Sequence, residues 1–173
     1  MAHRAPIIIV PYRSEWPQMF ADEQERLTLQ LPAKIKLEHI GSTSVVGLEA
    51  KPIIDIMLGA QSLTAVEALL PTLEALGYEY LPETEQQLPM RRFLAFPNTR
   101  PRAIHLHAVA LDSDFWREHV AFRDALRKDA HLARAYGALK RQLACKYGDD
   151  RAGYTEAKSA FIYEVLSRAA QAH

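Results

Sequence analysis

The segment Glu38-His39-Ile40-Gly41-Ser42-Thr43-Ser44, followed by Lys51-Pro52-Ile53-Ile54-Asp55-Ile56-Met57, decides the fold of this chain. Two apolar runs, residues 35–40 and 53–58, are typical of β-strands. Glycines, hydroxyl side chains and Lys51 lie between them, and the second run carries the carboxylate of Asp55. Glycine amides and hydroxyls after one strand, with a carboxylate on the next, suit a phosphate and a metal ion. The segment therefore predicts a strand–loop–strand unit in which Gly41, Ser42 and Thr43 bind a phosphate.

The side chains of the Asp55 strand alternate between two faces. Asp55 and Met57 share one face with Ile53, and the opposite, core-facing set is Ile54, Ile56 and Leu58. A carboxylate on a central strand must be hydrogen-bonded, ion-paired or bound to a metal, because burying an unpaired charge is costly. An ion pair with a nearby Arg or Lys is the structural interpretation, and a ligand or catalytic role is the functional one.

The last predicted strand, residues 103–111, repeats this pattern. His105 and His107 share one face, and apolar residues occupy the other. Two imidazoles two residues apart on a strand can bind a metal or a phosphate, whereas a lone histidine is usually structural. We therefore expect a site here, with Asp55, His105 and His107 as catalytic residues and metal ligands.

Basic side chains provide the remaining candidate ligands for a phosphate. Lys51 precedes the Asp55 strand, and Arg91 and Arg92 open another strand. Only one of these two arginines can face the site, because neighbours on a strand point to opposite faces. Three further candidates lie in predicted C-terminal helices, namely Arg123, Lys140 and Lys158. The alternative interpretation of each is a solvated surface charge.

The rest of the chain divides into a sheet-containing part, residues 1–111, and an all-helical part, residues 112–173, which we expect to form one domain. Helices are predicted over 15–30, from residue 63 to Gly77 with a kink or break at Pro71, and over 113–128, 130–147 and 154–170. Further short strands are predicted over 7–10, 78–81 and 92–96. The economical architecture is α+β, a mixed β-sheet with flanking helices and an all-helical C-terminal third.

The 173 residues include 21 Lys and Arg and 21 Asp and Glu, so no net charge favours nucleic acid or an anionic membrane. Neither a signal peptide nor an apolar run of about 20 residues is visible, and a cytoplasmic location is the expectation. The single cysteine, Cys145, excludes a disulfide framework, and its helical setting predicts a small core residue. The sequence carries no indication of the oligomeric state.

Several motifs together resemble the GrpB family, a branch of the polymerase-β-like nucleotidyltransferase superfamily. They cover nearly the whole chain, from Pro11-Tyr12 and the opening segment through Leu76-Gly77-Tyr78 and His105-Leu106-His107 to Phe122-Arg123-Asp124, Leu139-Lys140 and Tyr154-Thr155. Val46 stands where the family usually has proline. The resemblance implies a nucleotidyltransferase-like sheet. Because related modules are fused to dephospho-CoA kinases, it also points to nucleotide or coenzyme A metabolism.

The superfamily's catalytic pattern is Gly-Ser, two carboxylates one residue apart and a third on a neighbouring strand. Gly41, Ser42 and Asp55 match it, but Met57 replaces the second carboxylate. Two-metal phosphoryl transfer needs several oxygen ligands, which one aspartate does not supply. Asp55 with two imidazoles suits one divalent metal ion, and Mn²⁺, Zn²⁺ or Fe²⁺ suits this ligand set better than Mg²⁺ does.

These observations give three hypotheses. The first is a nucleotidyltransferase-like protein that binds a nucleotide or phosphorylated small molecule and transfers a nucleotidyl or phosphoryl group with one metal. The second is a binding or regulatory module that lost catalysis with the second carboxylate. The third is a purely structural polar network, which the clustering of ionisable groups disfavours. None of them includes a nucleic-acid or membrane partner.

Overall fold

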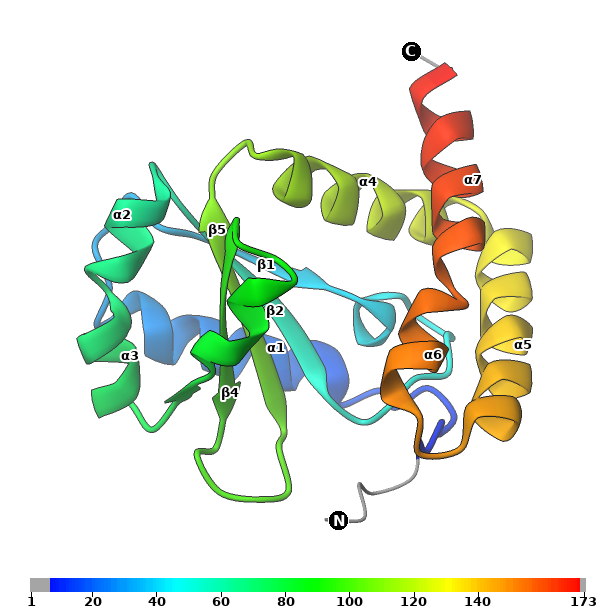
Figure 1. Ribbon diagram of the computed structural model, residues 1–173, viewed down its shortest axis with the longest axis horizontal. Coiled ribbons are helices and arrows are strands. Elements are labelled where there is room, and N and C mark those ends of the chain that lie inside the picture. Colours follow the sequence, from blue (N-terminus) through cyan, green and yellow to red (C-terminus); the bar gives the residue numbers. More distant parts are fainter. Residues whose placement is uncertain (1–6, 172–173) are drawn as a thin grey trace.

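A computed structural model of the chain describes residues 7–171. It has a five-stranded mixed sheet with helices on both faces (Figure 1). The strands are β1 (Lys36–Ile40), β2 (Ile54–Ala60), β3 (Glu79–Tyr80), β4 (Arg91–Phe96) and β5 (Ile104–Ala110). The helices are α1 (Trp16–Thr28), α2 (Leu63–Glu67), α3 (Leu70–Ala75), α4 (Asp114–Lys128), α5 (Ala130–Tyr147), α6 (Arg151–Glu156) and α7 (Ser159–Gln171), with 3₁₀ turns at Ser42–Ser44 and Pro82–Gln86. The predicted α+β architecture with a helical C-terminal third is confirmed.

The strand order is β1-β2-β5-β4-β3. Strands β2 and β5 run parallel, and the other neighbouring pairs run antiparallel. Because β2 and β5 are both interior strands, the polar residues that they carry lie in the middle of the sheet. This topology positions Asp55 and the two histidines on adjacent strands.

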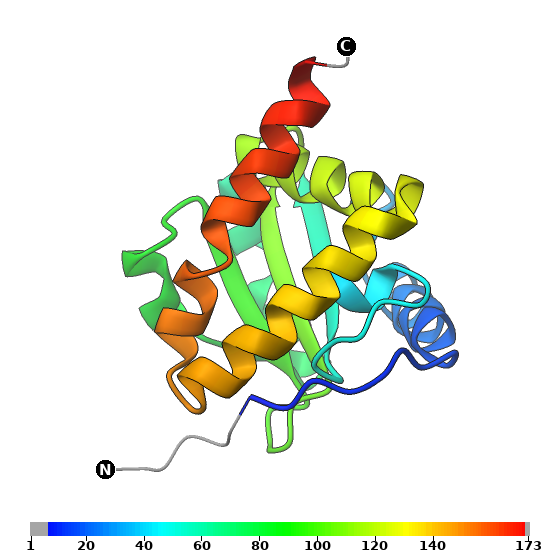
Figure 2. The ribbon, with the colours of Figure 1, turned by 90° about the vertical axis from the view of Figure 1, so that its right-hand side faces the viewer.

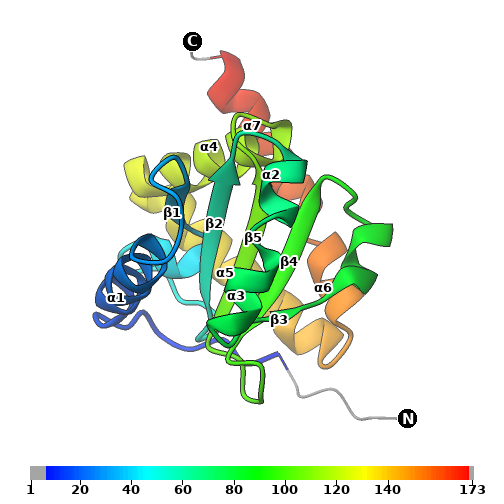
Figure 3. The ribbon, with the colours of Figure 1, turned by 90° about the vertical axis from the view of Figure 1, so that its left-hand side faces the viewer.

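The two faces of the sheet have different covers. Helices α1, α2 and α3 lie on one face (Figure 3), where the largest core cluster includes Ile54, Ile56 and Leu58 of β2. Helices α4 and α5 cross the opposite face, with α6 and α7 beside them (Figure 2). Met57 is fully buried there against Trp116 of α4. The predicted division of β2 into a core face and an Asp55 face is correct, but helices cover both.

Local signals in the sequence account for several element ends. Ser62 caps α2 by accepting a hydrogen bond from the Ala65 amide, and Pro71 lies at the break between α2 and α3. Asp129 caps α5 through the amides of His131 and Leu132. The break near Pro71 agrees with the expectation from proline chemistry.

Two predictions are wrong. The helix expected over 154–170 is divided into α6 and α7, because α6 packs Tyr154 beside α5 whereas α7 packs on α4. Cys145, expected in the core, is exposed, because the buried face of α5 carries Tyr136, Lys140 and Leu143 instead. The strand predicted over 7–10 is an extended segment, joined to the rest of the fold by a single β-bridge from Val10 to Ala50.

Within residues 7–171, no helix is long and apolar enough to cross a membrane.

Candidate functional site

Asp55 contacts both histidines across the β2–β5 pair. The parallel register sets Asp55 opposite His105 and Met57 opposite His107, so all four side chains share a face. His107 Nε2 lies 3.2 Å and His105 Nδ1 lies 3.5 Å from Asp55 Oδ1. The structure therefore brings together the three residues predicted as the centre of the site.

Arg91 determines the tautomer of His107. Its guanidinium lies 3.2 Å from His107 Nδ1. Because a guanidinium only donates, Nδ1 accepts and the ring proton lies on Nε2, which donates to Asp55. Burial lowers the pKa of His107, so the ring is neutral near pH 7.

The carboxyl group of Asp55 is held in its ionised form. Burial opposes ionisation of Asp55, but hydrogen bonds from His105 and His107 outweigh the effect of burial and hold the pKa of Asp55 far below the usual range. Asp55 is therefore a permanent carboxylate.

The loop after β1 packs tightly against that carboxylate. Gly41 has φ 70° and ψ −174°, a conformation open almost only to glycine. A Cβ atom here would lie 2.7 Å from Asp55 Oδ2. The Ser44 hydroxyl donates to the Gly41 carbonyl at 2.6 Å, and the Thr43 hydroxyl lies 3.0 Å from His39 Nε2. The loop is thus held in place by its own hydroxyl groups beside Asp55.

Four cationic side chains line a cavity of about 270 Å³ at this point, together with Asp55 and the Gly41–Thr43 loop. They are Lys51 from the loop before β2, Arg91 from β4, Lys140 from α5 and Lys158 between α6 and α7. Asp55 is the one acidic side chain among the cavity-lining residues in the described part of the chain. The cavity is therefore suited to an anion.

Burial and mutual repulsion perturb these lysines. Burial, followed by the charge of Lys158, lowers the pKa of Lys140 to about 7. Burial, followed by the charge of Lys51, lowers the pKa of Lys158 to about 8. Lys140 also donates to the Glu49 carbonyl, and the Lys158 ammonium lies 4.4 Å from the centre of the Tyr154 ring. Ionisable groups destabilised in this way are more frequent at functional sites than elsewhere.

Two predicted phosphate ligands lie outside the cavity. Arg92 points to the opposite face of β4 and pairs with Glu67 and Glu85, as expected for the neighbour of Arg91 on a strand. Arg123 is buried in α4, where it pairs with Glu38 and Asp124 and donates to the His39 carbonyl. Arg92 and Arg123 have ion-pair partners within the fold and do not line the cavity, whereas Arg91 does.

Aromatic residues complete the lining, and none of them is among the site residues predicted from the sequence. They are Phe93, Tyr136 and Tyr154. Phe93 lies opposite His107 in the β4–β5 register, and its ring centre is 5.1 Å from that of His105 and 5.2 Å from that of His107. Its position two residues after Arg91 on a strand was the available signal, because such residues share a face.

The arrangement of Asp55, His105 and His107 matches the predicted metal site poorly. Within residues 7–171, no group of three or more His, Cys, Asp or Glu side chains is arranged to hold a metal ion. His107 directs a proton, not a lone pair, at Asp55, and four cations surround the carboxylate. The protein side chains by themselves therefore favour an anion over a divalent cation at this point.

Comparison with known proteins shows the family to which this sequence belongs. The family model of the GrpB protein matches residues 6–168. The chain belongs to the GrpB family. It is 33% identical over 169 residues to the glutamate-rich protein GrpB of Alkalihalophilus pseudofirmus, covering 95% of this chain and 97% of that protein. It is also 27% identical to a dephospho-CoA kinase of Mycolicibacterium paratuberculosis, covering 96% of this chain and 46% of the kinase.

Two solved structures have a similar fold. A crystal structure of the conserved protein GrpB from Enterococcus faecalis superposes with a TM-score of 0.79 at 37% identity, covering 94% of this chain and 96% of that one. The Cid1 poly(U) polymerase bound to MgATP superposes with a TM-score of 0.55 at 18% identity, covering 79% of this chain and 44% of that one. The second likeness concerns the fold alone, and the fold of this GrpB protein is nucleotidyltransferase-like.

Proposed function

We propose that the cavity beside Asp55 binds a nucleotide or another phosphorylated small molecule. The observation that carries this proposal is the convergence of Lys51, Arg91, Lys140 and Lys158 on a cavity with one carboxylate. Burying four cations together costs free energy unless an anion neutralises them. Phosphate groups form the charge-assisted hydrogen bonds that Arg and Lys side chains offer.

The remaining residues of the cavity have roles consistent with such a ligand. Gly41 and Ser42 offer a close approach to the loop backbone and a hydroxyl donor. Asp55 Oδ2, which packs on Gly41, is available to accept a hydrogen bond from a ligand hydroxyl. The rings of Phe93, Tyr136 and Tyr154 provide apolar walls.

Transfer of a nucleotidyl or phosphoryl group is the second candidate, favoured by the nucleotidyltransferase-like fold. Met57 limits it, because the position of a second carboxylate is filled by a fully buried apolar side chain under α4. A divalent metal in this cavity would enter with the ligand, whose phosphates offset the four cations. Catalysis is therefore expected only where the ligand supplies part of the metal coordination.

Thermal-shift and titration calorimetry measurements test the binding proposal. Nucleoside triphosphates, coenzyme A and dephospho-CoA are each added with and without Mg²⁺, Mn²⁺ or Zn²⁺; the coenzyme A arm follows from the dephospho-CoA kinase relative. At least one is expected to raise the melting temperature, because a ligand that binds only the native state stabilises it. No shift with any of them would overturn the proposal.

The chain offers a matched pair of variants for this measurement. Arg91→Leu is expected to weaken binding at least tenfold, because it removes a charged hydrogen-bond donor from the cavity. Arg92→Leu removes the same charge from the adjacent residue, on the opposite face of the strand, and is expected to leave affinity unchanged.

A third variant, Asp55→Asn, separates the two candidate functions. If adding a metal ion still increases the ligand affinity of this variant, Asp55 has no part in metal-assisted transfer.

A further inference from the structure

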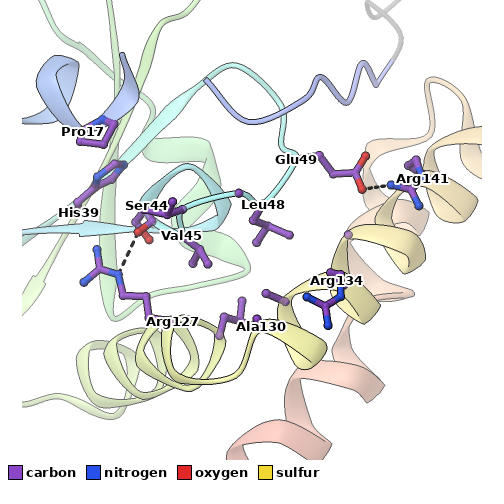
Figure 4. A pocket seen from close by; sticks show the side chains of 15 residues that line it. Pro17, His39, Ser44, Val45, Leu48, Glu49, Arg127, Ala130, Arg134 and Arg141 are labelled. Atoms are coloured by element: carbon purple, nitrogen blue, oxygen red, sulfur yellow. Dashed lines mark hydrogen bonds and ion pairs between the residues drawn. The ribbon is translucent and has the colours of Figure 1, made fainter. Parts of the chain in front are cut away.

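A second and larger cavity lies on the other side of the loop that borders the candidate site. Residues Ser44 to Glu49 form one wall, and the opposite wall is formed by the end of α4 and one face of α5 (Figure 4). Its volume is about 830 Å³. We refer to this cavity as the α5 groove. It shares none of its lining residues with the Asp55 cavity.

The floor of the α5 groove is apolar and contains small residues. Val45 and Leu48 of the loop belong to one buried cluster with Leu126 and Ala133. On α5, Ala133 and Gly137 line the groove and are four residues apart, so they lie on one side of the helix. The chain's own loop already packs closely here, because a Cβ added at Gly137 would lie 2.8 Å from Glu49 Oε1 and 3.4 Å from Leu48. Val46 lines the same groove with 79% of its surface exposed, which gives the rim an unpartnered apolar side chain.

Three arginines line the helical side of the groove: Arg127, Arg134 and Arg141 (Figure 4). All three are exposed. Arg127 donates through Nε to the Ser44 carbonyl at 3.0 Å, and Arg141 pairs with Glu49. Glu49 is the one acidic side chain among the described residues that line the groove. The groove therefore combines an apolar floor with an excess of positive charge.

The arrangement fits a peptide better than a nucleic acid. No Phe, Tyr or Trp is found among the described residues that line the groove, so bases would lack the aromatic platforms on which single strands usually stack. Arg134 and Arg141 are seven residues apart on one helix, a separation of about 10 Å along the axis at 1.5 Å per residue. Carboxylates seven residues apart on an approaching helix have the same spacing. Laying an amphipathic helix into an apolar groove is a common mode of peptide recognition.

We propose that the α5 groove is a docking site for an acidic amphipathic segment of a partner protein, which places apolar side chains against the exposed Val46 and carboxylates beside Arg127, Arg134 and Arg141. This proposal is independent of the ligand in the Asp55 cavity, because the two cavities have separate linings.

The test is an unbiased selection followed by charge reversal. A yeast-displayed library of random 16-residue peptides is sorted against the purified full chain, and the best binder is synthesised with a fluorescent label. The enriched sequences are expected to carry negative charge together with apolar residues. In fluorescence anisotropy, the variant Arg134→Glu/Arg141→Glu is expected to bind the selected peptide at least tenfold more weakly. Replacing the peptide's acidic residues by lysine is expected to restore part of that loss.

Matched controls make each outcome decisive. Arg117→Glu/Arg168→Glu reverses two exposed, ion-paired arginines of α4 and α7 that do not line the groove, and it should leave binding unchanged. Circular dichroism and a melting curve verify folding, and the single variant Arg134→Gln replaces the double variant if that one unfolds. The proposal is overturned by selection of neutral or basic peptides, by no selection, or by binding that survives the reversal. Tighter binding of a 16-nucleotide single-stranded RNA through the same arginines would overturn it in favour of nucleic acid. A dimer abolished by the reversal would assign the groove to a second copy of the chain.

Discussion

Gly41 is the residue on which the geometry of the candidate site depends most directly. Its backbone conformation is strained for any residue with a Cβ, and Asp55 Oδ2 occupies the space that a Cβ would need. The same close approach gives a ligand access to both the loop backbone and the carboxylate. One glycine thus serves the turn and the site together.

Gly41→Ala is therefore expected to reduce both stability and ligand binding. The substitution adds a Cβ 2.7 Å from Asp55 Oδ2 in a backbone region that L-residues avoid. We expect a loss of about 1–3 kcal/mol in the free energy of unfolding, measured by urea denaturation. Gly47→Ala is the matched control, because Gly47 also has a positive φ but no atom within 4 Å of an added Cβ. Equal affinity of the Gly41 and Gly47 variants for the ligand found by thermal shift would contradict the role given to this loop.

At the scale of elements, helix α5 separates two surfaces of different chemistry. Tyr136 and Lys140 face the Asp55 cavity, whereas the next residues along, Gly137 and Arg141, face the α5 groove. Glu49 contacts both sets, since its carbonyl accepts from Lys140 and its carboxylate pairs with Arg141. The helix and the loop before β2 together form the partition between the two cavities.

Helix α4 packs on the sheet through a different contact. Gly59 of β2 leaves room for the ring of Trp116 and for Leu111, and an added Cβ would lie 2.6 Å from the ring and 2.8 Å from Leu111. This contact lies in the small cluster that buries Met57, next to the candidate site.

Gly59→Ala is expected to destabilise the protein by overpacking this contact. The cost is about 1–3 kcal/mol, because the rigid Trp116 ring must shift. Denaturant titration measures the change. The double variant Gly59→Ala/Trp116→Leu should recover part of the loss, because a smaller side chain then faces the new methyl group. A double variant less stable than the sum of the two single changes would contradict this explanation.

At the scale of the whole molecule, the Asp55 cavity exists only where the sheet and the C-terminal helices meet. Asp55, Arg91 and the two histidines come from the sheet, and Lys140 and Lys158 come from the helices. The cations lie close enough to lower one another's pKa values. The free protein therefore carries an electrostatic cost that a bound anion would relieve.

Lys158→Met is expected to stabilise the free protein while it weakens anion binding. The folded protein holds the pKa of Lys158 at about 8, below its ordinary value of 10.5, mainly through burial. Between these two pH values the Lys158 side chain binds its proton more tightly in the unfolded chain, so the contribution of this group destabilises the folded protein at pH 7 and fades as pH approaches 10.5. The variant should gain about 1 kcal/mol below pH 8, a rise of roughly 2–4 °C in melting temperature, and lose this gain as pH approaches 10.5. Calorimetric melting of both proteins across pH 6.5–10 measures it.

Rising pH is expected to change ligand affinity in the opposite direction to the stability contribution of Lys158. Affinity of the wild-type protein for a phosphorylated ligand should fall as pH rises from 7 through 8, as Lys140 and Lys158 lose their charge. A phosphate gains charge only near pH 6, so the ligand itself cannot cause this decline. Affinity that rises over this interval, or a variant less stable than wild type at pH 7, would show that these lysines are structural.

The sequence by itself determined several features that depend on a side chain's direction within its own strand. Strand alternation separated Asp55 and Met57 from the core face, paired His105 with His107 and required that one of Arg91 and Arg92 point away. Capping and proline chemistry located helix ends, and the motifs indicated the family. These inferences succeeded because each rests on covalent geometry within a few residues.

Only the tertiary structure decided which elements meet. The parallel β2–β5 register brings Asp55 within hydrogen-bonding distance of His107, and helix packing admits Lys140 and Lys158 to the cavity but engages Arg123 elsewhere. In the folded protein, Cys145 is exposed and the last predicted helix is divided into α6 and α7. The physical reason is that local periodicity sets the face on which a side chain lies, whereas the neighbour of that face depends on packing between residues far apart in the chain.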